Sequence, residues 1–381
     1  MTAAGTAVID SDGHVLEPPD FWSAYVESGF RDRAPQLIRT TSGEQLLGYG
    51  EFAIGLDLLA LSLSTQHRAP VGSDGWEEES RHKLGASGGW DPVARQEDMD
   101  VDGIDIAVLY PTNMLHWIED TPLFAALCRA YNNWLHDFCA ANPSRLVGIA
   151  VVPLQDPVLA IRELQRCVDE LGFKGVMVRP APYIGTQKLY HPVYDSFWKE
   201  CTELDVAIGV HPLPYADMPN ATRGLRLDDG QMWTTQGLFL RQAIANAVDM
   251  QVALAWFVGG GICERFPSLR VGILEGSGGW ACTLLERLDH HFRIYGSEHQ
   301  RTLPSELFAR QCWVSFDPDE IALPFSVGHL GADRILWASD YPHPDAKIPG
   351  VVKELRAAIQ GLGARDQEQV LGGSARAFYR L

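Results

Sequence analysis

Several features that would assign a chain to a simple class are missing from this sequence. Residues 1–7 contain no basic segment followed by an apolar stretch, so we expect no signal peptide. No run of about 18 consecutive apolar residues occurs, so no membrane span is predicted. The seven cysteines form no CxxC pair, so a thiolate zinc site is not predicted. Their odd number and wide spacing indicate reduced, buried thiols in a cytoplasmic protein.

Positive charge is scarce as well. The sequence has 31 Lys+Arg against 49 Asp+Glu, and the formal net charge of −18 argues against nucleic acid and anionic membranes as partners. The net charge does not limit the choice of a small-molecule substrate, because a bound metal ion can reverse the local electrostatic field. The 46% hydrophobic residues argue against disorder, and 381 residues suit two ordinary domains or one large α/β domain with insertions.

Short apolar runs that alternate with helical patterns dominate what is present. Asp91-Pro92 and Asp156-Pro157 each supply a helix N-cap and a first-turn proline, and Gly103 and Gly172 end these two helices. No glycine-rich dinucleotide-binding motif follows the first apolar run. We therefore predict an α/β fold, a (β/α)₈ TIM barrel over 1–381, in preference to an open doubly wound sheet. The eight predicted strands are 7–10, 104–109, 147–152, 175–178, 206–210, 269–274, 312–316 and 335–338.

A long insertion after the first strand, residues 28–90, breaks the alternation. It contains a turn-like Ser42-Gly43-Glu44 between short β-prone pieces, and an apolar stretch at 56–63. Insertions of this length usually cover an active site or build a subunit contact. We therefore predict a cap or dimer-contact segment, and a surface excursion without a role is the alternative.

Titratable side chains gather at the predicted ends of four strands. Asp12 and His14 end the first strand two residues apart, His211 follows the fifth, Glu275 the sixth and Asp340 the eighth. In a barrel, the carboxyl ends of the strands converge on one face. A single His at a strand end is usually an ordinary hydrogen-bonded group, and a single Asp commonly caps a turn. Together, however, these imidazoles and carboxylates match the ligand preferences of Zn²⁺, Mn²⁺ and Fe²⁺.

Three motifs carry a resemblance to a known family. Asp10-Ser-Asp-Gly-His14, Glu264-Arg-Phe-Pro267 and Ser339-Asp-Tyr-Pro-His-Pro344 resemble the amidohydrolase-2 branch of the amidohydrolase superfamily. That branch includes aminocarboxymuconate-semialdehyde decarboxylase-like enzymes and the γ-resorcylate and 5-carboxyvanillate decarboxylases. The resemblance covers nearly the whole chain. It implies a metal-dependent TIM barrel with one divalent ion, Zn or Mn, with Fe as a further candidate.

The ligands that the resemblance implies are Asp12, His14, His211 and Asp340. The family has His-x-His or Glu-x-His on the first strand, so Asp12 is a shorter acid at a position where an acid has precedent. Many members have a histidine where this chain has Glu275. Its role stays open between a further ligand, a general base and a structural acceptor for backbone N–H groups.

The leading functional hypothesis is the one that the resemblance implies, non-oxidative decarboxylation of an aromatic or unsaturated carboxylic acid. The metal would position the substrate carboxylate and a neighbouring hydroxyl, and Asp340 or metal-bound water would deliver a proton to the carbon that carries the carboxylate. Hydrolysis of an amide, lactone or imine is the rival, with Asp340 or Glu275 as general base. A third reading is a barrel that binds a ligand without turnover.

Other residues are secondary candidates for the catalytic site. His343 is a candidate to orient the substrate or a metal ligand. Arg179 is a candidate to bind a substrate anion, with a salt bridge at the barrel rim as the alternative. His116 and Asn113 follow the second strand, and Trp280 is a candidate wall for a planar substrate, with ordinary packing as the alternative. The expected partners are a planar carboxylic acid and, by analogy with relatives, a second copy of the chain in a homodimer.

Overall fold

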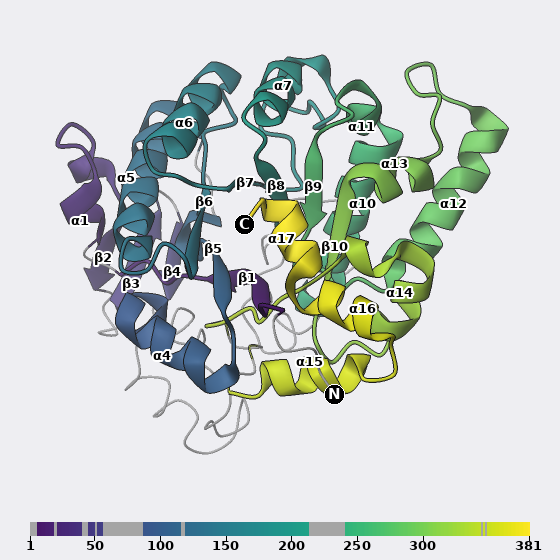
Figure 1. The fold of residues 1–381 in the computed structure, drawn as a ribbon. Helices are drawn as coiled ribbons and strands as arrows, with labels where there is room; N and C mark the ends of the chain where they lie inside the picture. Colours follow the sequence, from purple (N-terminus) through teal and green to yellow (C-terminus); the bar gives the residue numbers. More distant parts are fainter. Residues whose placement is uncertain are drawn as a thin grey trace. The chain divides into compact units, whose positions relative to one another are not determined.

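The computed structural model describes residues 6–18, 21–39, 45–49, 52–55, 87–115, 119–212, 241–343, 346 and 349–381. Eight strands follow chain order in one sheet, β1-β5-β6-β7-β8-β9-β10-β11, and helices separate successive strands (Figure 1). This alternation is that of a (β/α)₈ barrel. The predicted fold class is therefore confirmed.

All eight strands lie at the predicted apolar runs, and the first extends through His14. Their bounds are β1 (Ile9–His14), β5 (Ile106–Tyr110), β6 (Leu146–Ala150), β7 (Gly175–Val178), β8 (Ala207–Val210), β9 (Arg270–Ile273), β10 (Cys312–Phe316) and β11 (Ile335–Trp337). The main helices are α1 (Phe21–Tyr25), α4 (Pro92–Asp102), α5 (Thr121–Cys139), α6 (Pro157–Asp169), α7 (Asp195–Glu203), α10 (Asn246–Gly259), α11 (Ile262–Arg265), α12 (Trp280–Tyr295), α13 (Pro304–Gln311), α14 (Leu323–Leu330), α15 (Val351–Ile359), α16 (Ala364–Glu368) and α17 (Ser374–Tyr379).

Helices α4 and α6 begin where the sequence predicts. The side chain of Asp91 accepts hydrogen bonds from the N–H groups of Val93 and Ala94, and Asp156 caps the start of α6 in the same way. Gly103 ends α4 with φ 77°, a left-handed conformation that favours glycine because it has no Cβ.

Two compact units make up the chain. Unit 1 contains Met1–Ser11, Lys174–Ala338 and Lys353–Leu381, and unit 2 contains Asp12–Phe173 and Ser339–Val352. In unit 1, β7 to β11 pair in parallel with their neighbours, and Val210 of β8 is in register with Ile273 of β9. The facing residues are buried and apolar, as expected for a parallel sheet that is covered on both faces.

In unit 2, β5 pairs in parallel with β6, and the long helix α5 packs along this part of the chain. The end of β1 continues beside β5, because the N–H of Val15 donates to the carbonyl of Tyr110 at 2.9 Å. The segment that follows β11 also runs beside β1, because the N–H of Asp340 donates to the carbonyl of Asp12 at 3.2 Å. The second of these contacts brings residues more than 300 positions apart in sequence to the end of β1.

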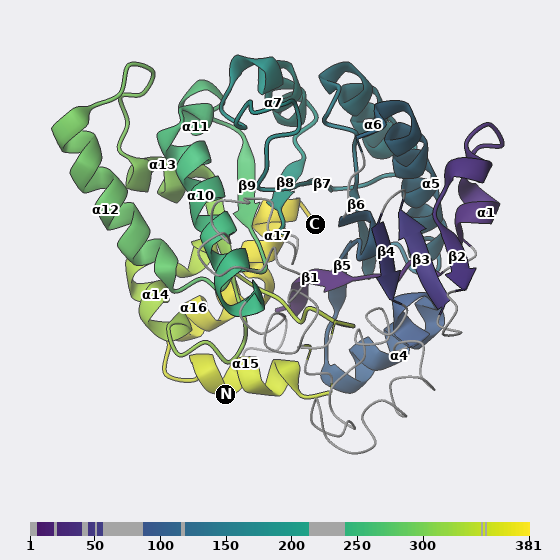
Figure 2. The same cartoon turned by 180° about the vertical axis from the view of Figure 1, so that it is seen from behind.

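Part of the insertion forms a small antiparallel sheet of β2 (Gln36–Arg39), β3 (Gln45–Tyr49) and β4 (Phe52–Gly55), seen from behind in Figure 2. The β-prone pieces on either side of Ser42-Gly43-Glu44 do pair with each other, and the turn itself lies outside the described residues. Residues 56–86 also lie outside them, so the role of this segment as a cap or dimer contact stays a prediction.

Among the described helices, one stretch has the length and composition of a membrane span. It runs over Ala243–Arg265, with a mean hydropathy of 1.2 and 44% of its best window buried. Core helices of soluble proteins satisfy the same criterion. Within unit 1, α10 buries Met250, Leu254 and Phe257, and the Phe257 ring packs edge-on against Trp198 at 5.5 Å between centroids.

Candidate metal centre

Two ligand candidates lie on β1 and share one side of the strand, because alternate residues of an extended chain point the same way. Asp12 and His14 are both buried. The Nδ1 atom of His14 lies 2.7 Å from the carbonyl oxygen of Pro111, a group that can only accept a hydrogen bond. The proton of a neutral His14 is therefore assigned to Nδ1. Its Nε2 atom then carries a lone pair, 3.6 Å from Oδ1 of Asp12 and 3.3 Å from Oδ1 of Asp340.

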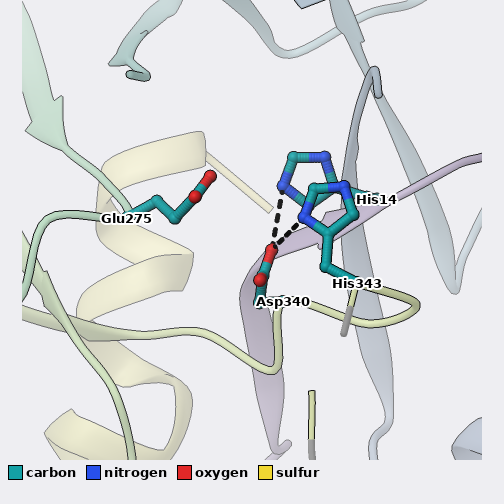
Figure 3. Close-up of side chains that lie close together, drawn as sticks. All are labelled: His14, Glu275, Asp340 and His343. Atoms are coloured by element: carbon teal, nitrogen blue, oxygen red, sulfur yellow. Dashed lines mark hydrogen bonds and ion pairs between the residues drawn. The ribbon is translucent and has the colours of Figure 1, made fainter. Parts of the chain in front are cut away.

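A tight turn after β11 supplies the second carboxylate. Asp340 has φ 53°, a left-handed conformation that is uncommon for residues other than glycine and is enriched for aspartate. The N–H of His343 donates to the carbonyl of Asp340 at 2.8 Å, which closes the turn. The Nδ1 atom of His343 lies 2.7 Å from Oδ1 of Asp340 (Figure 3). One oxygen of Asp340 therefore contacts both imidazoles.

A buried arginine from α4 joins these two segments. The Nη1 atom of Arg95 donates to the carbonyl of His14 at 2.7 Å and to the carbonyl of Tyr341 at 3.4 Å, and its guanidinium lies 4.7 Å from the centre of the Tyr341 ring. The N–H of His14 also donates to the carbonyl of Tyr341 at 2.7 Å. Backbone hydrogen bonds and one cation–π contact thus fix the relative positions of His14 and Asp340.

A second pair lies in unit 1, at the ends of β8 and β9. His211 follows Val210, Glu275 follows Leu274, and the N–H of Leu274 donates to the carbonyl of Val210 at 3.0 Å, so the register brings the two side chains together. Nδ1 of His211 lies 2.7 Å from the carbonyl oxygen of Pro212, and Nε2 lies 2.8 Å from Oε2 of Glu275.

The other oxygen of Glu275, Oε1, accepts a hydrogen bond from Nδ2 of Asn246 at 3.2 Å. Glu275 has φ 44°, a conformation that is rare for a glutamate, and Ser277 has φ 55°. Gly276 between them is packed closely, because a Cβ there would lie 2.5 Å from Cγ of Met250. Backbone strain of this kind concentrates at functional sites and persists only where the surroundings impose it.

The donor set of unit 2 fits a divalent cation. Ligand atoms from His14, Asp340 and His343 lie within 4.8 Å of one another. A neutral His14 whose Nδ1 is protonated directs a lone pair toward two carboxylates, and such acceptors repel one another unless a proton or a cation lies between them. Metal-bound histidines typically donate their other ring N–H to a carbonyl or carboxylate, as His14 does to Pro111. The nitrogen and oxygen donors suit Zn²⁺ and Mn²⁺.

His343 is better placed as a partner of Asp340 than as a ligand. Its Nδ1 contacts Asp340, and its Nε2 lies 2.9 Å from Oγ1 of Thr112, so both ring nitrogens have hydrogen-bond partners. The ring lies against that of His14, with 3.9 Å between centroids. The roles predicted for His343, orientation of the substrate or of a ligand and catalysis, stay predictions.

The four predicted substrate-binding residues have different surroundings. Arg179 follows β7 and is buried. Burial lowers the pKa of its guanidinium to about 10, although the nearby Tyr183 and Asp249 act to raise it. Asn113 is buried, with its side-chain nitrogen donating to the carbonyl of Glu17 at 3.2 Å. Trp280 donates to the carbonyl of Gly276 at 2.8 Å and so braces the turn after Glu275. His116 lies outside the described residues.

Four residues that sequence reasoning missed support these side chains: Thr112, Glu17, Arg95 and Asn246. Thr112 follows the end of β5 by two residues, so the rule that identified Asn113 could have found it. Arg95 and Asn246 lie on helices far in sequence from the residues that they contact, and nothing in their local patterns marks them. Glu17 precedes a proline and resembles a surface turn, although its side chain is buried.

Three named relatives match between 29% and 77% of this chain. A 2-amino-3-carboxymuconate-6-semialdehyde decarboxylase from Dictyostelium discoideum is 26% identical, covering 77% of this chain and 77% of its own length. A γ-resorcylate decarboxylase from Rhizobium sp. is 29% identical, covering 64% of this chain and 74% of its own length. A 2-keto-4-carboxy-3-hexenedioate hydratase from Sphingobium sp. is 30% identical over 29% of this chain and 34% of its own length.

Solved structures agree with the fold. An amidohydrolase from Mycobacterium avium subsp. paratuberculosis superimposes with a TM-score of 0.79 at 22% identity, covering 99% of this chain and 100% of that one. A dihydroxybenzoic acid decarboxylase from Polaromonas sp., with bound manganese and the inhibitor 2-nitroresorcinol, gives a TM-score of 0.67 at 19% identity, covering 99% and 98%. The family model described as Amidohydrolase (Amidohydro_2) matches residues 9–381. The chain therefore belongs to this amidohydrolase family.

Proposed function

We propose that this protein is a metal-dependent, non-oxidative decarboxylase of a planar aromatic or unsaturated carboxylic acid. The observation that carries the proposal is the His14–Asp340–His343 cluster, in which one carboxylate oxygen contacts two imidazoles at the end of β1. Two relatives that match 77% and 64% of this chain are named decarboxylases of such acids, which supports the same reaction class.

Asp12, His14, His211 and Asp340 are the residues that would hold the ion. The first two and Asp340 lie together in unit 2, and His211 is added because residues that follow the strands of a (β/α)₈ barrel converge on one face. We propose Mn²⁺ or Zn²⁺, since imidazole and carboxylate donors suit both. When bound, the ion would concentrate positive charge on the substrate carboxylate and a neighbouring oxygen.

The residues of the chain would handle the proton. Decarboxylation forms a C–H bond at the carbon that carries the carboxylate and breaks the C–C bond to it, so one proton is consumed for each CO₂ released. Asp340 would carry this proton, because its Oδ1 lies 2.7 Å from Nδ1 of His343, which can exchange the proton with it. Arg179 stays charged near neutral pH despite its lowered pKa and is proposed to attract the substrate anion.

The experiment combines metal analysis with a substrate panel. Purified protein loaded with Mn²⁺ or Zn²⁺ is offered hydroxybenzoates such as 2,6-dihydroxybenzoate, muconate semialdehydes, lactones and amides. Release of CO₂ from either of the first two groups is the expected result. Protein with less than about 0.2 equivalents of bound ion and no gain on adding either metal contradicts the metalloenzyme proposal, since an essential ion must be present in stoichiometric amounts.

Hydrolysis is the second candidate, and Glu275 is the observation that favours it. This carboxylate contacts Nε2 of His211 and is oriented by Asn246, an arrangement that suits a general base acting on water. Activity confined to lactones or amides in the same panel would select hydrolysis and reject decarboxylation.

The cytoplasmic location and the homodimer remain proposals as well, and size-exclusion chromatography with light scattering tests the latter.

A further inference from the structure

The loop that follows β5 contacts the candidate site through two consecutive residues. The carbonyl of Pro111 accepts from Nδ1 of His14 at 2.7 Å. The hydroxyl of Thr112 lies 2.9 Å from Nε2 of His343. Neither the metal-ligand set nor the proton route described above includes Thr112. A residue in this position can nevertheless control how His343 is presented to Asp340.

The direction of the Thr112 hydrogen bond follows from its neighbours. The carboxylate of Asp340 accepts hydrogen bonds, so Nδ1 of His343 donates to it at 2.7 Å. In a neutral ring Nε2 is then an acceptor, and the hydroxyl of Thr112 must be the donor. The hydrogen-bonded order is therefore Thr112 to His343 to Asp340, which defines one tautomer and one ring orientation.

The loop itself is fixed by a buried carboxylate. Oε2 of Glu17 accepts from the N–H of Asn113 at 2.8 Å, and Oε1 accepts from the N–H of Met114 at 3.2 Å. Glu17 is 3% exposed, so both hydrogen bonds are shielded from water. The β-branched side chain of Thr112 adds stiffness at χ1. The hydroxyl is thus held by a constrained side chain on a constrained loop.

We propose that Thr112 is a positioning residue of this enzyme, whose hydroxyl donates to Nε2 of His343 and holds the imidazole against Asp340. The part of the inference that concerns turnover rests on the proposed function. The hydrogen bond itself does not, because it joins residues of this chain and can be measured without metal or substrate.

The kinetic test compares Thr112→Val, which keeps the shape and removes the hydroxyl, with Thr112→Ser, which keeps the hydroxyl. We expect Thr112→Val to lower kcat about 10- to 100-fold with KM changed less than about 3-fold, because positioning errors act on the reaction step more than on binding. Thr112→Ser should restore kcat to within about 3-fold of the wild type, as one retained hydrogen bond implies. Thr202→Val is the matched control, since the Thr202 hydroxyl donates to the carbonyl of Trp198 at 3.0 Å within α7.

The structural test uses ¹⁵N NMR of histidine-labelled, metal-free protein, with His343 assigned by the signals that disappear in His343→Gln. In the wild type, Nε2 of His343 should resonate upfield of a non-bonded imine nitrogen. Thr112→Val should move it downfield, and Thr112→Ser should not.

The outcomes separate the two proposals. An inactive wild type whose Nε2 signal responds to Thr112→Val supports the hydrogen bond and overturns the proposed function. An active wild type in which Thr112→Val leaves both kcat and the Nε2 signal unchanged overturns the positioning role. Equal kcat losses in Thr112→Val and Thr112→Ser also overturn it, because the hydroxyl would then not be the feature that matters.

Discussion

The His–carboxylate groups at β1 and at β8–β9 are built on the same plan and differ in their charge. In both, a histidine directs Nδ1 to a backbone carbonyl and Nε2 to a carboxylate. In both, the carboxylate that follows the later strand has a positive φ, 53° at Asp340 and 44° at Glu275. The β1 group, however, places two carboxylates near Nε2 of His14, with His343 donating to one of them, whereas the β8–β9 group pairs one carboxylate with one imidazole.

This difference raises the question whether His211 joins the proposed metal site or forms only an ion pair with Glu275. A protonated His211 would satisfy Glu275 by itself, with Asn246 donating to the second oxygen. Near Nε2 of His14 lie two carboxylates, and Nδ1 of His343 donates to Asp340 but not to Asp12, so a divalent ion has more to gain there. Substitutions in the two groups test this distinction.

The largest effect is expected for Asp340→Asn. The substitution keeps the shape of the side chain and removes both the charge and the proton carrier, so kcat should fall about 10³-fold or more, the usual range for a lost general acid or base. Steady-state kinetics measures the fall in kcat, and mass spectrometry measures the content of bound metal. Full turnover in this variant would refute the role given to Asp340.

The next largest effect is expected for His14→Gln and His211→Gln, compared with each other. Loss of a direct ligand should weaken metal binding by more than about 100-fold, since loss of an outer hydrogen-bond partner alone typically costs 10- to 100-fold. We expect both variants to show this loss when the metal affinity is measured by competition with a chelating dye. An unchanged affinity in His211→Gln alone would show that the β8–β9 group is an ion pair outside the metal site.

A pH-dependent effect on stability is expected from Glu17. Burial raises the pKa of Glu17 from 4.5 to about 7. The hydrogen bonds that its carboxyl group accepts from backbone N–H groups lower the pKa, but burial has the larger effect. The folded protein therefore retains this proton where the unfolded chain has released it. The contribution of Glu17 to stability is greatest below pH 4.5 and is lost as the pH rises to about 7.

Denaturant unfolding of the wild type and Glu17→Gln at several pH values measures this contribution. Relative to Glu17→Gln, the wild type should lose up to about 3 kcal/mol of unfolding free energy over that window, because each unit of pKa shift corresponds to about 1.4 kcal/mol. Above pH 7.5 the difference should stay constant. Parallel curves for the two proteins across the whole range would contradict the raised pKa.

The smallest effect is expected for Asn246→Ala. Without the amide, one oxygen of Glu275 loses a hydrogen bond worth about 1 kcal/mol, so kcat should fall about 3- to 10-fold with the metal content unchanged. Asn133→Ala is the control, since Asn133 is a helical asparagine that belongs to neither group and whose Oδ1 accepts from Nη1 of Arg166 at 2.8 Å. A loss of bound metal in Asn246→Ala would place Glu275 among the ligands.

Much of the fold could be predicted because its signals are local. Buried parallel strands are continuous apolar runs, and an Asp-Pro step followed later by a glycine defines a helix such as α4. Asp12 and His14 were predictable for the same reason, since their spacing on a strand determines that they share a side. Arg95 was not, because a buried arginine that donates to the carbonyls of His14 and Tyr341 has the same helical pattern as an exposed one.

The sequence by itself determined the alternating strands and helices, the histidines and acids at the strand ends and the excess of negative charge, because each depends on residue type and short-range order. The tertiary structure decided which nitrogen of each histidine faces a carboxylate, that Glu17 is buried and that Thr112 contacts His343. Those features depend on contacts between segments far apart in sequence, 231 positions in the Thr112–His343 pair, and on backbone angles such as the φ of 44° at Glu275. Neither is encoded in the neighbouring residues, because both depend on contacts with segments that are distant in sequence.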